Sequence, residues 1–298
     1  MKSPTLLLYI VAAAIPGQSA PLGVAGEFSA FVLGNASQSH VDTTGRVAVG
    51  GNARFESYGV GSGLTVDPNR YDLVVGGDLW YHDGEVHNGS VSVGGTADVA
   101  RVGLPHGSLT VGSTPPVDFV AAATYLTNAS GYWGGWGNST GAMVDTAQNQ
   151  IRLAGSSNMN VFNLTLPNLI SYFEITAPVG STVLVNVDNA AASLQNFGFV
   201  LNGVDKQHVL FNFYNASTLY TSGVGVPGSI LAPFASYNSG SGDVDGSLIV
   251  RDLTGHVEIH NVGFAGEFGS AVPEPSTWAL LAGGLATVAV GKWRAKRP

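Results

Sequence analysis

The residues with the clearest capacity for chemistry lie near the C-terminal end of the chain, where His256, Glu258 and His260 alternate with apolar residues. Alternate side chains of a β-strand point to one face, so two imidazoles and a carboxylate would share a surface. Such ligands suit Zn²⁺ or Fe²⁺. The two histidines, however, would lie about 13 Å apart along an extended strand, too far to share one ion without a bulge. The pattern therefore favours an exposed polar strand face.

A second group of candidate ligands lies just before these residues, in a segment that resembles part of a calcium-binding loop. It contains Asp243 and Asp245 followed by glycine, and Asp252 stands where an EF-hand loop has its bidentate glutamate. Extracellular calcium sites tolerate weak affinity and few ligands. Weak Ca²⁺ binding by these three aspartates is therefore an alternative, although we expect no resident metal or cofactor.

The sequence contains no recognisable catalytic nucleophile. The Gly-Ser-Gly segments at 61–63 and 240–242 lack the strand, turn and helix context of a nucleophile elbow. The chain has no cysteine, which excludes thiol nucleophiles, disulfides and Cys-ligated metals. Glu85 and His87 share one face beside a glycine, and a polar turn explains them. We predict no catalytic residues and expect that the protein is not an enzyme.

Three aromatic residues, Tyr132, Trp133 and Trp136, lie in a glycine-rich segment. Exposed aromatic rings can stack on sugar rings. The interpretation we favour is a loop packed over the end of the fold.

The elements that must position these residues are short strands that end in glycine. Val-Gly-Gly recurs at 49–51, 75–77 and 93–95, and Val-Gly-Ser at 111–113, with offsets of 26, 18 and 18 residues. Each recurrence ends a stretch in which every second residue is apolar, the period of a half-buried strand. A parallel β-helix needs this combination, because each coil repeats a strand and a corner. A glycine-rich β-sandwich with coincidental spacing is the alternative.

The expected fold class is mainly β: a right-handed parallel β-helix-like solenoid with one helix and an inserted strand-rich region. Residues 117–129 have helical spacing of apolar residues and predict that helix. The strand-rich region covers about 130–225, and its topology is left open. The coil pattern returns at 228–233, 246–250 and 256–260.

Composition favours one folded domain over residues 21–270. Residues 21–271 contain seven Lys or Arg and nineteen Asp or Glu, which gives a net charge of −12. Nucleic acid and anionic lipid are poor partners for such a surface. Glycine, at 41 of 298 residues, is about twice as frequent as usual, which suits a tightly wound β structure.

Both ends of the chain carry apolar segments typical of targeting signals. Lys2 precedes an apolar stretch, and small residues follow up to Ala20, so residues 1–20 are expected to be a secretory signal peptide. At the other end, the apolar run 278–290 covers roughly 20 Å of a hydrocarbon layer about 30 Å thick. Four basic residues follow it and would stay on the cytoplasmic side. We expect a short hydrophobic helix that holds the chain transiently in the inner membrane through residues 278–291.

The tail 271–298 resembles the PEP-CTERM sorting signal of bacteria that have exosortase systems. Pro273, Glu274 and Pro275 match its short motif, and the apolar run and basic end follow in the right order. The resemblance implies processing by an exosortase-type enzyme at the inner membrane and delivery to the cell surface.

The domain itself resembles the choice-of-anchor A domain of bacterial surface proteins. The resemblance spans about residues 24–268 and rests on the segments 28–34, 45–52, 228–233 and 255–261. It implies a β-helix-type exported domain with an adhesive role and supplies no mechanism.

We therefore expect an exported bacterial surface protein, a non-enzymatic adhesin or a component of the exopolysaccharide matrix, at the cell surface or in the extracellular matrix. Its partners would be the exosortase-type enzyme and exopolysaccharide or another surface, without nucleic acid. The alternative is a carbohydrate-active enzyme, a polysaccharide lyase or hydrolase on a β-helix scaffold. Ice or mineral binding would need regular rows of Thr or Asp, and the threonines of this chain are not periodic.

Overall fold

The computed structural model describes residues 21–268, which contain a 20-stranded sheet, a four-stranded sheet and one α-helix. The expected signal peptide, the hydrophobic C-terminal helix and the motif Pro273, Glu274 and Pro275 lie outside these residues. Within residues 21–268, no helix has the length and apolar character needed to cross a membrane.

The large sheet is built from coils that stack on one another. Strands pair in parallel with strands one circuit further along the chain: β1 with β4, and β2 with the start of β5. The strand bounds are β1 (Ala30–Val32), β2 (Ala36–Ser39), β3 (Asp42–Thr43), β4 (Val47–Val49), β5 (Ala53–Val60), β6 (Tyr71–Val75), β7 (Leu79–Val86), β8 (Ser90–Val93), β9 (Ala97–Gly103) and β10 (Leu109–Val111). This pairing produces the β-helix-like arrangement that the glycine repeats predicted.

Each coil contributes to three faces. The helix-side face contains β1, β4, β6, β8, β10 and, later in the chain, β13 (Met159–Leu164), β15 (Thr182–Val187) and β18 (Val209–Asn212). The second face contains β2, β16 (Ala191–Gln195), β19 (Thr218–Ser222) and the first halves of β5, β7 and β9. The third face contains β3, β20 (Val224–Val226), β22 (Gly242–Val244) and β24 (Glu258–Ile259). β21 (Ser229–Ser239) and β23 (Leu248–Gly255) run through the helix-side face into the second face.

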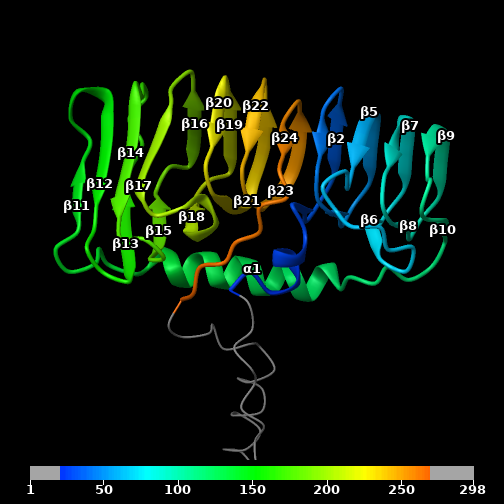
Figure 1. Ribbon diagram of the computed structural model, residues 1–298, viewed down its shortest axis with the longest axis horizontal. Helices are drawn as coiled ribbons and strands as arrows, with labels where there is room; N and C mark the ends of the chain where they lie inside the picture. The colour runs from blue at the N-terminus through cyan, green and yellow to red at the C-terminus, as the bar shows by residue number, and fades with distance from the viewer. Residues whose placement is uncertain (1–20, 269–298) are drawn as a thin grey trace, which may run out of the picture.

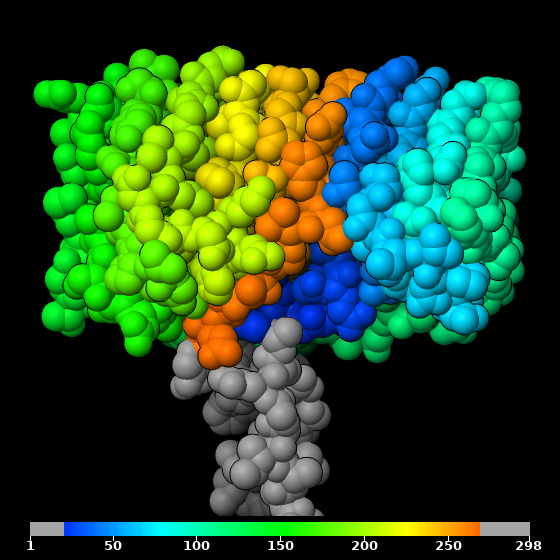
Figure 2. Space-filling model, viewed as in Figure 1, coloured from blue at the N-terminus to red at the C-terminus, as the bar shows by residue number. Residues whose placement is uncertain are grey.

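The first coil lies in the middle of the stack. β1 pairs with β4 on one side and with β23, from the end of the domain, on the other. Figures 1 and 2 show this as the blue N-terminal coil between the orange C-terminal strands and the cyan ones. The chain thus builds one half of the stack, passes to the far end, and winds back to meet its own start.

The helix α1 (Phe119–Gly134) makes that passage along the helix-side face (Figure 1). The side chain of Asp118 caps its first turn by accepting a hydrogen bond from the amide of Ala121, at 2.9 Å. Its buried residues, among them Leu126 and Trp133, pack against outward-facing side chains of the sheet. The expected helix is confirmed, but it continues to Gly134.

The second half of the stack follows α1. The strand-rich region expected at 130–225 is present, but it is not an insertion: β18 pairs with β15 and with β21, so these coils are continuous with the rest. At the far end, a four-stranded sheet is formed by β11 (Met143–Asp145), β12 (Gln150–Ala154), β14 (Tyr172–Ala177) and β17 (Phe199–Gly203). The short 3-10 helices are η1 (Gly23–Glu27), η2 (Ala147–Asn149) and η3 (Lys206–His208).

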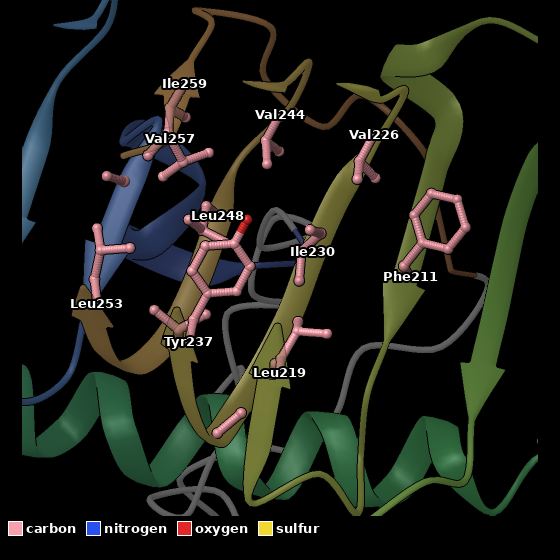
Figure 3. Packing of buried hydrophobic residues seen from close by; sticks show 14 of the residues in the cluster. Phe211, Leu219, Val226, Ile230, Tyr237, Val244, Leu248, Leu253, Val257 and Ile259 are labelled. Carbon is pink, nitrogen blue, oxygen red and sulfur yellow. The ribbon is translucent and has the colours of Figure 1, made fainter. Parts of the chain in front are cut away.

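The hydrophobic core lies inside the coils, where the apolar side chains of each coil pack on those of the next. Figure 3 shows Leu219, Tyr237 and Leu253 of the second face pointing towards Ile230, Leu248 and the third-face residues Val226, Val244 and Ile259. All of these side chains are buried. Burial of this continuous apolar column is the main stabilising contribution, because every coil covers the apolar face of its neighbour.

The corner between the helix-side face and the second face is held by side chains that bond to the next coil. Asn35 Oδ1 accepts from the amide of Asn52, Asn52 Oδ1 from that of Asp78, and Asp78 Oδ1 from that of Thr96. Asp252 continues the same row by accepting from the amide of Asn35. The hydrogen bond with the Thr96 backbone holds the pKa of Asp78 below its usual value.

Candidate functional site

The expected strand face with His256, Glu258 and His260 does not form. β24 contains only Glu258 and Ile259, so the two histidines lie beyond its ends. His256 Nδ1 lies 2.7 Å from the carbonyl oxygen of Ser39, at the corner between the second and third faces. Within residues 21–268, His260 is the one residue of the three that belongs to a group of side chains able to share a metal ion, so His256, Glu258 and His260 do not form the three-residue metal site considered from the sequence.

His260 instead approaches the two aspartates of the adjacent strand. β22 and β24 pair in parallel with Asp243 opposite Glu258, which places Asp245 opposite His260. One ligand atom from each of Asp243, Asp245 and His260 lies within 4.8 Å of the others. We call this group the Asp–His cluster. The sequence pointed to all three residues but divided them between two separate sites, because only the strand register brings them together.

Asp252, the third aspartate of the expected calcium loop, is engaged elsewhere. It forms an ion pair with Arg251 at 2.8 Å and accepts a hydrogen bond from Ser236 Oγ at 3.1 Å. Burial alone would raise the pKa of Asp252, but these partners and the Asn35 amide outweigh it and lower that pKa. The carboxylate is part of the corner row described above. Among the described residues 21–268, the group that could share an ion contains Asp243 and Asp245 but not Asp252, so the predicted set of three aspartates does not assemble.

The charges of the Asp–His cluster are unequally compensated. Lys206 Nζ lies 2.9 Å from Asp245 Oδ2, and His260 Nδ1 lies 2.7 Å from Asp245 Oδ1. Burial would raise the pKa of Asp245, but these two neighbours outweigh it and lower that pKa. Asp243 has no hydrogen bond or ion pair within residues 21–268, and burial together with the Asp245 charge raises its pKa.

Asp243→Asn is therefore expected to increase stability slightly at neutral pH. The pKa of Asp243 is raised on folding, so the folded chain holds the proton more tightly than the unfolded chain does. Ionisation of Asp243 therefore destabilises the fold as the pH rises from acid to neutral. The gain should not exceed about 0.5 kcal/mol, since solvent screens a half-exposed group. Thermal unfolding of both proteins at neutral and acid pH measures it. The difference in stability between the two proteins should vanish at acid pH. An Asp243→Asn variant that is less stable than the parent at neutral pH would contradict the raised pKa of Asp243.

The acidic character continues along the third face. Strand register places Glu258 beside Asp243 and, on its other side, Asp42. Like charges directly opposite one another in adjacent strands are unfavourable. Two strands beyond Asp42 on the same face, Glu85 forms an ion pair with His87 at 2.8 Å. The polar turn expected around Glu85 and His87 is thus part of β7 and its end, on an acidic surface.

The aromatic residues expected in a loop are divided between core and surface. Trp133 lies in the last turn of α1 and is buried, in contact with Phe268. Trp136 is half-buried, and Tyr132 is 46% exposed and packs edge-on against Trp136. The glycines that follow suggested a loop, whereas Trp133 anchors the helix end. The packing interpretation is therefore correct for Trp133.

The second face offers a broad polar surface that the sequence did not reveal. One outward row, read across the coils by strand register, contains Ser193, Tyr220, Asn238, Thr254, Ser37, Arg54, Trp80 and Asp98. The Arg54 guanidinium lies 3.5 Å from the centre of the Trp80 ring, which also stacks on His82 at 3.9 Å. Arg54, Trp80 and Asp98 line a shallow groove of about 380 Å³, which runs along the corner residues Asn35, Asn52, Asp78 and Thr96.

Comparison with known families identifies the domain. A family model described as an ice-binding-like adhesive domain matches residues 21–261, most of the chain. The chain belongs to this family. A second match, to the PEP-CTERM protein-sorting motif, covers residues 271–297 and confirms the sorting signal. The matched family carries a different description from the choice-of-anchor A domain that the sequence resembles.

Solved structures similar to this adhesive domain include three ice-binding proteins. The protein of the Antarctic ascomycete Antarctomyces psychrotrophicus is 13% identical, with 83% of this chain and 98% of that chain covered and a TM-score of 0.40. A protein from an Arctic yeast is 11% identical, with 85% and 96% covered and a TM-score of 0.38. One from an Antarctic Flavobacteriaceae bacterium is 12% identical, with 81% and 78% covered and a TM-score of 0.34. None of the curated proteins matches the chain in sequence.

Proposed function

We propose that the protein is an exported bacterial surface adhesin, or a component of the exopolysaccharide matrix, whose role is binding rather than catalysis. The observation that carries this proposal is the presence of two matches in one chain: an adhesive domain over 21–261 and a sorting motif over 271–297. The first suggests what the domain does and the second where it is delivered. The choice-of-anchor A resemblance points in the same direction.

The route follows from the two ends of the chain. A signal peptide over residues 1–20 starts export, and the tail holds the chain transiently in the inner membrane through residues 278–291. An exosortase-type enzyme would then process the tail near Pro273, Glu274 and Pro275. We also infer a right-handed winding of the coils, because connections between parallel strands of one sheet are almost always right-handed.

The second face is the surface that we assign to adhesion. The helix-side face is covered by α1, and the third face is acidic and would repel anionic polymers. The row that contains Arg54 and Trp80 combines an exposed cation, an aromatic ring and small hydroxyl side chains. Such groups suit sugar rings that carry hydroxyl and carboxylate substituents. Exopolysaccharide is therefore the proposed partner.

Ice binding is stated for the three similar structures, and we do not propose it for this chain. The outward row named above contains one threonine, Thr254, among residues of very different sizes. A flat ice-binding surface would need a regular row of similar small side chains.

Retention on exopolysaccharide tests the proposed function. Residues 21–271 contain the whole described core, and this fragment should be retained on the host's exopolysaccharide without releasing shorter products. Trp80→Ala should weaken retention by about threefold to tenfold, the contribution of one aromatic contact. Tyr172→Ala is the matched control, because Tyr172 faces Arg152 in the four-stranded sheet, away from this surface.

Three outcomes would count against the proposal. Release of shorter sugar products would favour the alternative, a carbohydrate-active enzyme on the same scaffold. Failure of the intact fragment to bind any fraction of the matrix would remove the adhesive role. Equal loss of retention in both aromatic variants would show that the second face is not the binding surface.

A further inference from the structure

We propose that Asp243, Asp245 and His260 form a binding site for a divalent transition-metal ion of the Zn²⁺ class. Asp243 lies in β22, Asp245 follows the end of β22, and His260 follows the end of β24. β22 and β24 are direct neighbours in the sheet. One ligand atom from each side chain lies within 4.8 Å of the other two. The site is independent of the proposed adhesive surface on the second face.

The strand register explains why these side chains converge. Val244 and Ile259 point into the core and are fully buried, so the residues on either side of them point outwards. Asp243 and Asp245 therefore flank Val244 on one strand, and His260 follows Ile259 on the next. Adjacent strands lie about 4.8 Å apart, a separation that side chains of this length can bridge to one ion.

Asp243 lacks the partner that a half-buried carboxylate normally has. It makes no hydrogen bond or ion pair within residues 21–268, although Asp245 and Glu258 are both close. Its oxygens lie over Gly225, where an added Cβ would be only 2.9 Å from Oδ1. The glycine thus leaves room for a carboxylate that is held against the sheet without a donor, and a bound cation would supply the missing charge.

Lys206 competes with a metal ion at this site without blocking it. Its ammonium contacts Oδ2 of Asp245, whereas Oδ1 of the same carboxylate faces His260 Nδ1 at 2.7 Å. A metal ion would replace the proton between Oδ1 and Nδ1, because a ligating imidazole must be deprotonated at that nitrogen. Glu258 lies 3.8 Å from His260 Nε2, where it can orient the ring from the other side.

The donor set determines the class of ion. One imidazole nitrogen and two carboxylates suit Zn²⁺, which accepts nitrogen and oxygen ligands in a four-coordinate site. Ca²⁺ prefers six to eight oxygen ligands and would therefore gain little from the imidazole nitrogen of His260. Three protein ligands also leave a fourth position for water or for an oxygen atom from outside the protein.

Calorimetric titration of the full-length chain, purified in detergent and stripped with EDTA, tests the site. We expect one ZnCl₂-binding event that CaCl₂ does not reproduce. His260→Ala and Asp243→Asn should each weaken Zn²⁺ binding by about tenfold or more. His256→Ala is the matched control and should bind as the parent does, because His256 contacts Ser39 outside the cluster.

Lys206→Met separates a metal site from a structural ion pair. Removing the ammonium frees Asp245 Oδ2 and takes away a positive charge, so Zn²⁺ should bind more tightly. Circular dichroism before each titration establishes that the variants are folded. The proposal would be overturned if the parent did not bind Zn²⁺, if His260→Ala bound Zn²⁺ as the parent does, or if Lys206→Met bound it more weakly. Ca²⁺ binding that does not depend on His260 would also overturn it.

Discussion

Gly76→Ala is expected to lower the free energy of unfolding by about 3 kcal/mol, which is the upper end of the usual cost of inserting an extra carbon atom into a close-packed region. Gly76 is the first glycine of a Val-Gly-Gly corner, and a Cβ at this position would collide with the carbonyl oxygen of Gly50 in the coil beneath. Its amide also donates to the Val49 carbonyl at 2.7 Å, so the backbone cannot move away without loss of a hydrogen bond. Chemical denaturation measures the change.

Gly131→Ala is the control for this substitution. Gly131 lies in α1, and a Cβ added there meets no heavy atom within 4 Å. Alanine is the better helix former, so this variant should gain about 0.5–1 kcal/mol. If Gly76→Ala were as stable as the parent while Gly131→Ala behaved as expected, the corners would not be in close backbone contact, and the explanation of the glycine repeat would be wrong.

Asn212→Ala should cost about 3 kcal/mol, because it leaves several buried polar groups without partners. Asn212 is fully buried and donates to Asn186 Oδ1 and to the carbonyl oxygen of Ser130, both at 2.9 Å. It also accepts from the Ser130 hydroxyl at 2.6 Å. Since Ser130 belongs to α1, the same bonds join the helix to the coils.

Two measurements separate loss of this network from general destabilisation. Denaturation gives the free energy, and hydrogen exchange should show faster opening of α1 than of β1 or β4 in the variant. Asn215→Ala is the control, because Asn215 is exposed and makes one side-chain bond, to Asp188 at 2.9 Å. An Asn212→Ala protein with parental stability, or with exchange unchanged in α1, would show that the network does not attach the helix.

The local pattern of the sequence predicted the strands well and their arrangement less well. Val-Gly-Gly marks corners because its glycines lie against the backbone of the preceding coil, as Gly76 does against Gly50, and this close approach recurs at the three Val-Gly-Gly corners. The position of the first coil in the middle of the stack depends on pairing between Ala30 and Leu248. No local period can reveal a contact between residues so far apart in sequence.

The candidate site shows the same division between local and distant information. Asp243, Asp245 and His260 were recognised as possible ligands from their residue types. Their convergence depends on the register of β22 against β24, which an alternating pattern does not specify. Trp133 was misplaced for a different reason: the glycines after it suggest a loop, whereas packing against Phe268 extends the helix.

Surface delivery is the most direct test of the central claim, that this adhesive domain is exported and sorted to the cell surface by its tail. Replacing Pro273, Glu274 and Pro275 with alanine in the full-length chain, with Ser276→Ala and Thr277→Ala as a control in the same tail, isolates the motif. Fractionation of cells should find the first variant unprocessed in the inner membrane and the control at the surface. Normal surface delivery of the first variant would contradict the account.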